Sequence, residues 1–269
     1  MAIVKGFMQM SGSIQGVSFY TRRGSDKVIM RTKGGPKKSQ IEGSPRFEKS
    51  RKNQCEFAGS ARFGSLSRHA FGGLHRLADY NLTPALIGIG KNLMTLDANG
   101  EVGKRNLKLS VFKEALEGFN FNRNYPFTTV LRVSPRWELD RENLQAVVTI
   151  PRINTDTDLL NIQKLPFFRL IVAIGTISDM VYNPVKDIYE PVVVELHGTS
   201  QTLTGEWNTT QTILPVQTLT VQMPESRVPF LTDNVTVLLS MGVEFGNVGF
   251  TGTPEEVKYA GCGKVLATR

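Results

Sequence analysis

The sequence predicts an α+β fold, in which an N-terminal hairpin arm and a helical region precede an all-β sandwich of the Ig-like or jelly-roll-like kind. Residues 16–33 have the alternation and turn chemistry of a β-hairpin, and helix start signals follow from residue 44. After about residue 127, short β-branched segments alternate with turn-rich pieces, which is typical of a sandwich. We therefore divide the chain into a basic hairpin arm and connector (1–43), a helical region (44–125) and a sandwich domain (126–269).

The predicted hairpin consists of two strands, "VSFYT" and "VIMRT", which are joined by the turn residues "RGSD". The next stretch, "KGGPKKSQIEGS", is interpreted as an extended connector because Gly-Gly-Pro interrupts regular structure. An isolated hairpin is only marginally stable in water. We therefore expect this one to need another surface, from its own chain or from another copy.

Three helix starts are predicted, at Ser44-Pro45, at Thr83-Pro84 and at Ser110, with Gly118 as the end of the third helix. Small residues between positions 58 and 65 weaken the first helix, so we expect another backbone to approach it closely, within or between chains. A poor helix with loops is the alternative. The candidate helix interface consists of Phe47, Arg51, Phe57, Gly59 and Gly64.

Seven later segments are predicted to be strands because they are short, β-branched and bounded by turn residues. They cover residues 128–135, 143–151, 166–177, 191–198, 212–224, 234–246 and 257–268.

No motif in the chain predicts an enzyme. His69 and His75 are six positions apart, which places them on different faces of a helix and argues against a shared metal, and His197 is expected to face solvent at a strand end. Cys55 and Cys262 are isolated, so they form neither a disulfide framework nor a zinc site. We therefore expect no catalytic residues, no metal and no cofactor.

Three further patterns resemble binding motifs but have simpler interpretations. "GIGKN" at 88–92 lacks the frame of a phosphate-binding loop and predicts a packed glycine pair in a helix. "NTDTD" at 154–158 lacks the glycine and the distal glutamate of a calcium loop and predicts a turn. Glu255 and Glu256 predict a charged turn.

The net charge of +8 is unevenly spread along the chain. Residues 1–125 contain 21 Lys and Arg against 9 Asp and Glu, a net charge of +12, and residues 126–269 have a net charge of −4. This split predicts contact with an anionic partner, either nucleic acid or the acidic half of a neighbouring copy, and a solvated basic face is the alternative.

The candidate assembly or anion-contact arm combines basic residues with two aromatic ones, a mixture that single-strand binders use for stacking. It consists of Phe19, Tyr20, Arg22, Arg23, Lys27, Arg31, Lys33, Lys37 and Lys38. No recognised nucleic-acid motif covers these residues.

The first sixty or so residues contain a spaced pattern of "G-x-V-x-F-Y", a glycine turn, "R-x-K-G-G-P" and "F-x-x-x-R-x-x-x-x-E-F". Its positions are Gly16, Val17, Phe19, Tyr20, Gly24, Arg31, Lys33, Gly34, Gly35, Pro36, Phe47, Arg51, Glu56 and Phe57. This pattern resembles the opening of a group of uncharacterised proteins from Bacteroidota and their phages. The resemblance implies a source and not an activity. The plan of arm, helical region and sandwich is also similar to that of phage virion proteins.

These observations predict a non-enzymatic structural subunit of a repeating assembly, such as a phage virion, a phage-derived particle or a filament. Its partners would be copies of itself, joined through the arm, and other structural proteins of the assembly. The main alternative is a nucleic-acid-binding protein that uses the basic half. A carbohydrate- or surface-binding sandwich is a third, although Trp137 and Trp207 are its only tryptophans. With neither a signal peptide nor a 20-residue apolar run, we expect no membrane insertion, synthesis in the cytoplasm and incorporation into a particle.

Overall fold

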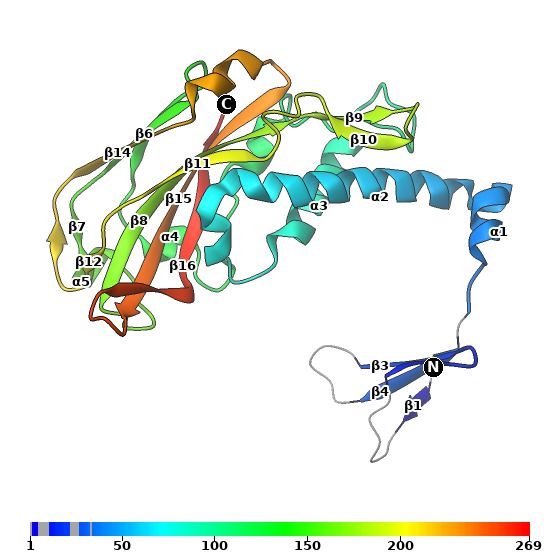
Figure 1. Ribbon diagram of the computed structural model, residues 1–269, viewed down its shortest axis with the longest axis horizontal. Coiled ribbons are helices and arrows are strands. Elements are labelled where there is room, and N and C mark those ends of the chain that lie inside the picture. The colour runs from blue at the N-terminus through cyan, green and yellow to red at the C-terminus, as the bar shows by residue number, and fades with distance from the viewer. Residues whose placement is uncertain (1, 5–10, 22–26, 33) are drawn as a thin grey trace. The chain divides into compact units, whose positions relative to one another are not determined.

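The computed structural model describes residues 2–4, 11–21, 27–32 and 34–269 (Figure 1). Contacts divide the chain into two compact units, Met1–Arg51 (unit 1) and Lys52–Arg269 (unit 2), and each is described by itself. The predicted boundaries after residues 43 and 125 differ from this one. The fold is mixed helix and sheet, with many antiparallel strands that lie mostly in the C-terminal part, which agrees with the predicted α+β class.

Unit 1 contains a four-stranded antiparallel sheet in the order β1-β4-β3-β2. Its strands are β1 (Ala2–Val4), β2 (Gly12–Ile14), β3 (Val17–Thr21) and β4 (Val28–Thr32). The predicted hairpin is confirmed, because β3 pairs with β4 from Val17 opposite Thr32 to Thr21 opposite Val28. The predicted "RGSD" turn lies outside the described residues.

The connector was wrongly predicted to be extended throughout, because α1 (Lys38–Gly43) lies within it. The side chain of Gln40 accepts a hydrogen bond of 2.9 Å from the backbone N–H of Lys37 and closes the first turn. The 3₁₀ helix η1 (Pro45–Phe47) follows, with Ser44 as its N-cap residue, and leads into α2 (Glu48–Ser67).

The predicted first helix does not continue regularly beyond α2. It becomes the 3₁₀ segment η2 (Arg68–Leu77), which is broken at Gly72, where φ is 58° and ψ is −146°. The remaining helical segments of unit 2 are α3 (Leu82–Thr95), η3 (Lys113–Leu116), α4 (Phe127–Val130), α5 (Thr155–Asp158) and η4 (Glu225–Phe230).

The other two predicted helix starts have different outcomes. The second is nearly right, since α3 begins one residue before Thr83 and Asn81 caps it. The third is wrong. Ser110 binds Asp179 through both its backbone N–H and its hydroxyl, at 2.8 and 2.6 Å, so it cannot cap a helix, and only the short η3 forms.

Two larger sheets organise unit 2. The central sheet has the order β11-β8-β15-β16, with β12 also paired to β8, and the smaller sheet has the order β14-β6-β5. Two further pairs, β9 with β10 and β7 with β13, complete the described strands. The strands are β5 (Arg136–Asp140), β6 (Gln145–Ile150), β7 (Ile153–Asn154), β8 (Phe167–Ser178), β9 (Met180–Asn183), β10 (Ile188–Pro191), β11 (Thr199–Thr204), β12 (Asn208–Thr209), β13 (Ile213–Leu214), β14 (Gln217–Gln222), β15 (Val235–Val248) and β16 (Pro254–Thr268).

Five of the seven predicted strand segments contain strands, namely those that became β6, β8, β13 with β14, β15 and β16. Residues 128–135 were wrongly predicted, because the carbonyl of Pro126 accepts bonds from Thr129 and Val130 and starts the short helix α4. Residues 191–198 were also wrongly predicted. Pro191 ends β10, and the rest of the segment forms bends and turns, since Val192 and Val193 donate to the backbone of Asp179 and the hydroxyl of Ser178 instead of to a strand.

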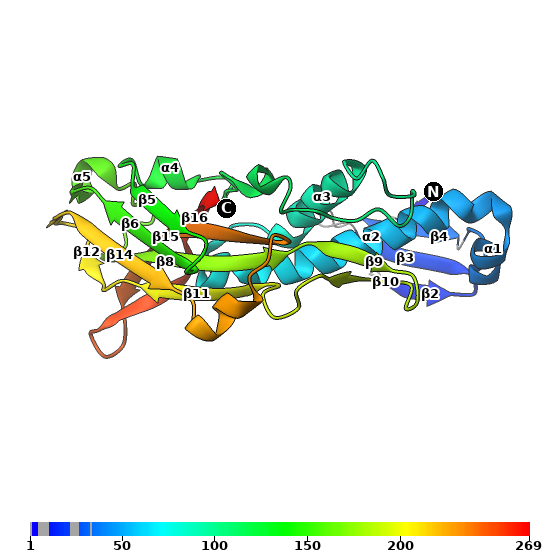
Figure 2. The ribbon, with the colours of Figure 1, turned by 90° about the horizontal axis from the view of Figure 1, so that it is seen from above.

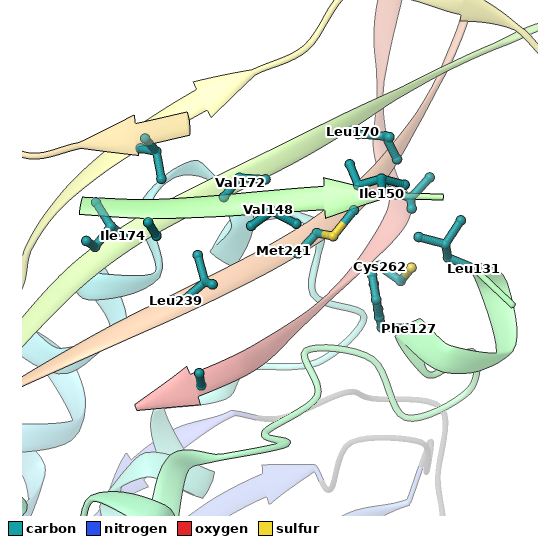
Figure 3. Close-up of a cluster of buried hydrophobic side chains, with 14 of the residues drawn as sticks. Phe127, Leu131, Val148, Ile150, Leu170, Val172, Ile174, Leu239, Met241 and Cys262 are labelled. Carbon is teal, nitrogen blue, oxygen red and sulfur yellow. The ribbon is translucent and has the colours of Figure 1, made fainter. Parts of the chain in front are cut away.

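Apolar side chains cover both faces of the central sheet. Figure 3 shows the first core, where Val148 of β6 lies close to Val172 of β8 and Met241 of β15, and Phe127 of α4 and Leu131, the residue after α4, lie at one end. The second core lies on the other face, where Ile171 and Ala173 of β8 meet η2 and α3. Figure 2 shows β6 and β14 as one layer beside β8 and β15. The long strands of the central sheet therefore have near-continuous apolar sequences, as strands buried on both faces do.

Close approach of η2 to the sheet depends on glycines. A Cβ at Gly175 of β8 would lie 1.8 Å from the carbonyl oxygen of Ala70, and one at Gly242 of β15 would lie 2.4 Å from the side chain of Leu74. A Cβ at Gly261 of β16 would meet both the backbone of Val243 and the side chain of Leu77. Each of the three neighbouring strands β8, β15 and β16 thus has a glycine, which has no side chain, where η2 packs against it.

None of the helices in the described part of the chain is long and apolar enough to cross a membrane.

We predict that Gly175→Ala lowers the free energy of unfolding by about 3 kcal/mol, because the new methyl group meets backbone that cannot move without displacing η2. Gly88→Ala in α3 is the matched control. Its Cβ meets no atom within 4 Å, so the substitution should stabilise the protein by about 0.5–1 kcal/mol through helix propensity. Urea denaturation of both variants measures the difference, and equal midpoints would contradict the argument.

Candidate assembly arm

Among the described residues of unit 1, no second layer packs on its sheet, although Val28 and Ile29 of β4 are buried. Ile14, Val17, Phe19, Val28 and Met30 share one of its faces, as their cross-strand pairing requires. The helical segments described for unit 1 form no layer over this sheet, and neither of the two apolar clusters includes a residue of unit 1. A single small sheet buries too little apolar surface for independent stability.

The two candidate aromatic residues lie on opposite faces of this sheet. Phe19 stands opposite Met30 on the apolar face, and Tyr20 stands opposite Ile29 on the other. Both aromatic side chains are half-buried. The phenylalanine is thus part of the apolar face that needs covering, and the tyrosine cannot share a stacking surface with it.

The basic candidates fall into two groups. Lys27, Arg31, Lys37 and Lys38 are exposed, and Lys38 forms an ion pair of 3.6 Å with Glu42, one turn along α1. Arg22, Arg23 and Lys33 lie outside the described residues.

The division into units changes the predicted charge split. Unit 1 contains eleven Lys and Arg against three Asp and Glu, and unit 2 contains 21 of each kind. The net charge is therefore +8 for unit 1 and zero for unit 2, so the acidic second half is not a property of a compact unit. The net positive charge of the whole protein thus lies in unit 1.

The candidate helix interface separates into residues with different environments. Arg51 donates two hydrogen bonds, of 2.6 and 2.9 Å, to the carbonyl groups of Ile41 and Ser44 within unit 1, where Phe47 is half-buried. Phe57 is 58% exposed in α2.

The two glycines of the candidate interface contact other parts of unit 2. A Cβ at Gly59 would meet the ring of Tyr189, and one at Gly64 would meet the backbone of Ile87 in α3. The close approach at Gly64 is thus made by a backbone of the same chain.

A buried ion cluster holds the part of α2 that belongs to unit 2. The carboxylate of Glu56 is fully buried and accepts bonds of 2.7 and 2.8 Å from Arg105, one of 2.9 Å from the backbone of Gly103, and one from Lys91 of α3. The hydrogen bonds from Arg105 are the main reason that the pKa of Glu56 falls to about 2. The helix that follows the arm is therefore fixed to unit 2 by charge as well as by packing.

A second ion cluster was missed from the sequence. Arg76 of η2 and Arg169 of β8 both bind the buried Glu244 of β15, and both also bind Glu256 of β16. The guanidinium of Arg169 also stacks on the ring of Trp207 at 4.2 Å. The prediction that Glu255-Glu256 forms a turn is wrong, because both residues belong to β16.

The histidine predictions need two corrections. His197 is buried and not solvent-facing, and desolvation lowers its pKa to about 4. The rings of His69 and His75 lie 6.2 Å apart, edge to face, because the break at Gly72 brings together residues that a regular helix would separate. Within the described ranges, no group of three or more His, Cys, Asp and Glu is placed to hold a metal ion.

Comparison with family models, with the curated proteins and with solved structures finds no match for this chain.

We predict that Glu56→Gln destabilises the protein by about 3 kcal/mol, because Arg105 and Lys91 would lose their shared anion. The matched control is Glu101→Gln. That residue forms exposed ion pairs with Lys52 and Lys104, and its replacement should leave the unfolding midpoint unchanged.

The same cluster predicts a pH dependence. The folded pKa of Glu56 is about 2, below its ordinary value of 4.5, so its contribution is fully present above pH 4.5 and is lost as the pH falls towards 2. Between pH 6 and pH 3, the difference in stability between the wild type and Glu56→Gln should therefore shrink. A constant difference across that range, measured by urea denaturation, would contradict the assigned role of the carboxylate.

Proposed function

We propose that this protein is a non-enzymatic structural subunit of a repeating assembly, and that unit 1 is the arm through which copies join. The observation that supports this most is the four-stranded sheet β1-β4-β3-β2, which has an apolar face on which the described residues of unit 1 place no second layer. Such a sheet gains stability when another copy covers the face or extends an edge. Strand addition at an edge is a common mode of association.

The apolar face and the sheet edges would contribute different interactions to this association. β1 and β2 are the edge strands of the sheet and present backbone N–H and C=O groups for pairing. The apolar face around Phe19 and Met30 supplies the surface to bury. A contact between the arm of one copy and a different surface of the next is heterologous, and such contacts build rings or filaments.

The body of such a subunit would be unit 2. Its two facing sheets enclose one apolar core, which is the general plan of the Ig-like or jelly-roll-like sandwich that we propose for it. The favoured setting is a phage virion or phage-derived particle of Bacteroidota, a proposal that rests on the resemblance of the first sixty residues. Other structural proteins of the same particle would then be further partners.

Light scattering and negative-stain microscopy of the full chain test the proposal. We expect regular oligomers, and we expect a variant that lacks residues 1–36 to be monomeric but folded, since both apolar cores lie in unit 2. Phe19→Ser should weaken assembly by removing an aromatic side chain from the apolar face, while Phe250→Ser, at an exposed site in unit 2, should not. A full chain that stays monomeric at high concentration would refute the proposal.

The charge of unit 1 favours nucleic acid as a second candidate partner. The triple variant Arg31→Gln, Lys37→Gln, Lys38→Gln should then weaken single-strand binding and reduce the slope of log K against log salt by about 2. The control triple variant Arg136→Gln, Lys164→Gln, Lys258→Gln removes three exposed charges from unit 2 and should leave that slope unchanged. Fluorescence anisotropy with a labelled oligonucleotide measures the slope for the wild type and for each triple variant. If the arm variant and the wild type have equal slopes, the arm is excluded as the binding surface.

A further inference from the structure

A hollow of about 200 Å³ opens on the surface of unit 2 beside an irregularity in the central sheet. Glu244 pairs with Gly261 and Gly246 pairs with Glu256, so the four residues 257–260 of β16 stand against Phe245 alone. At the centre of this bulge Tyr259 has a φ of 62°, a conformation that side chains other than glycine rarely adopt. Bulges and strained backbone of this kind are concentrated at binding sites, where they redirect a side chain.

Apolar side chains and unpaired polar groups converge on this hollow. Val130, Leu160 and Phe245 supply apolar walls. Around them lie four solvent-exposed side chains that form no hydrogen bond with any residue of the described chain, namely Tyr125, Tyr259, Asn124 and Gln163. Two phenol groups and two amides therefore supply both donors and acceptors around one apolar pocket, which is the usual composition of a small-molecule site.

The charges near the hollow restrict the ligand. Asp79 is the only carboxylate that lines it, and its oxygens accept bonds of 2.9 to 3.0 Å from the backbone N–H groups of Arg123 and Asn124. An anionic ligand would be repelled by this carboxylate. A cation would meet the ammonium group of Lys258, which sits over the ring of Tyr259 at 4.9 Å. The site therefore favours an uncharged ligand.

The polar groups and the size of the hollow further restrict the chemical class of the ligand. A wholly apolar ligand would bury the amides and phenols without partners. A ligand with several hydroxyl groups and one apolar face would satisfy them, and its apolar face would lie against the walls and the tyrosine rings. The volume is below that of most drug-sized pockets, so it suits one small ring and not an extended molecule.

We propose that this hollow binds a neutral monosaccharide unit, either free or at the end of a glycan. Tyr125 and Tyr259 would contact its apolar face, and Asn124, Gln163 and Asp79 would bind its hydroxyl groups. A single ring in a shallow site makes few contacts, so a dissociation constant in the millimolar range is expected. The proposal does not depend on the function proposed for unit 1, because every residue of the site belongs to unit 2.

Saturation-transfer NMR on the full chain tests the proposal, with glucose, galactose, mannose and N-acetylglucosamine as probes and with choline and glucuronate as charged controls. At least one neutral sugar should receive saturation, and neither charged compound should compete with it. Tyr259→Gly removes the ring and also relieves the positive φ, so the variant should fold, and its dissociation constant for the sugar should rise about tenfold. Phe250→Ala, an exposed aromatic position elsewhere in unit 2, should bind as the wild type does.

Three results would overturn the proposal. They are a lack of saturation of all four neutral sugars, equal binding by Tyr259→Gly and the wild type, and displacement of the sugar by choline. Gln163→Ala is a second variant, which removes one of the amides proposed to bind the hydroxyl groups and breaks no hydrogen bond within the described chain. A loss of sugar affinity in this variant, with an unchanged unfolding midpoint, would separate a binding role from a structural one.

Discussion

Burial of both faces of the central sheet is the constraint on which the structure of unit 2 depends. Leu170, Val172 and Ile174 point from β8 into the core shared with the smaller sheet, and Ile171 and Ala173 point into the core shared with η2 and α3. A strand with two apolar faces cannot border solvent on either side without exposing one of them. The helical layer is thus part of the same folding unit as the strands, which explains why the contacts show no boundary near residue 125.

The two ion clusters fix how the helical layer sits on this sheet. Glu56 joins α2 to α3 and to the segment of Gly103 and Arg105, and Glu244 joins β15 to η2, β8 and β16. In such clusters, desolvation of a buried carboxylate offsets part of the attraction, but removal of one partner leaves a buried charge unpaired and is strongly destabilising. Their donors come from several elements at fixed positions, and a shift of η2 or α3 along the sheet would leave a buried charge unpaired. They therefore determine the register of the layers as well as contributing to the free energy of unfolding.

The sequence predicted elements whose cause is local and failed where partners are distant. The hairpin of unit 1 and the long strands follow from alternation and turn residues, which are visible in a short window. The helix at Ser110 failed because Asp179, 69 residues away, binds its backbone and hydroxyl. His197 was expected to face solvent because nothing beside it in the sequence shows that the end of β8 covers it.

Prediction from sequence has the same limit for the candidate sites, because it misses residues that are distant along the chain. The residues of the arm are neighbours in sequence, so their charge could be read directly. The hollow beside Tyr259 combines Asp79, Asn124, Gln163 and the bulge of β16, and only the folded chain brings these together. A search for tryptophans could not find it, because the aromatic side chains at the hollow are tyrosines and a phenylalanine.

The location of the charge separates the possible roles of the arm. With a net charge of +8 on unit 1 and none on unit 2, attraction between a basic and an acidic half cannot drive head-to-tail association. If arms pair with one another, their like charges repel, and salt strengthens assembly by screening that repulsion. If an arm packs on the body of a neighbour, which has no net charge, burial of the apolar face dominates and salt has little effect. If the arm binds phosphates, salt weakens the complex steeply. Salt therefore strengthens, leaves unchanged or weakens the association of the arm, depending on which of the three partners it binds, and the measured direction identifies that partner.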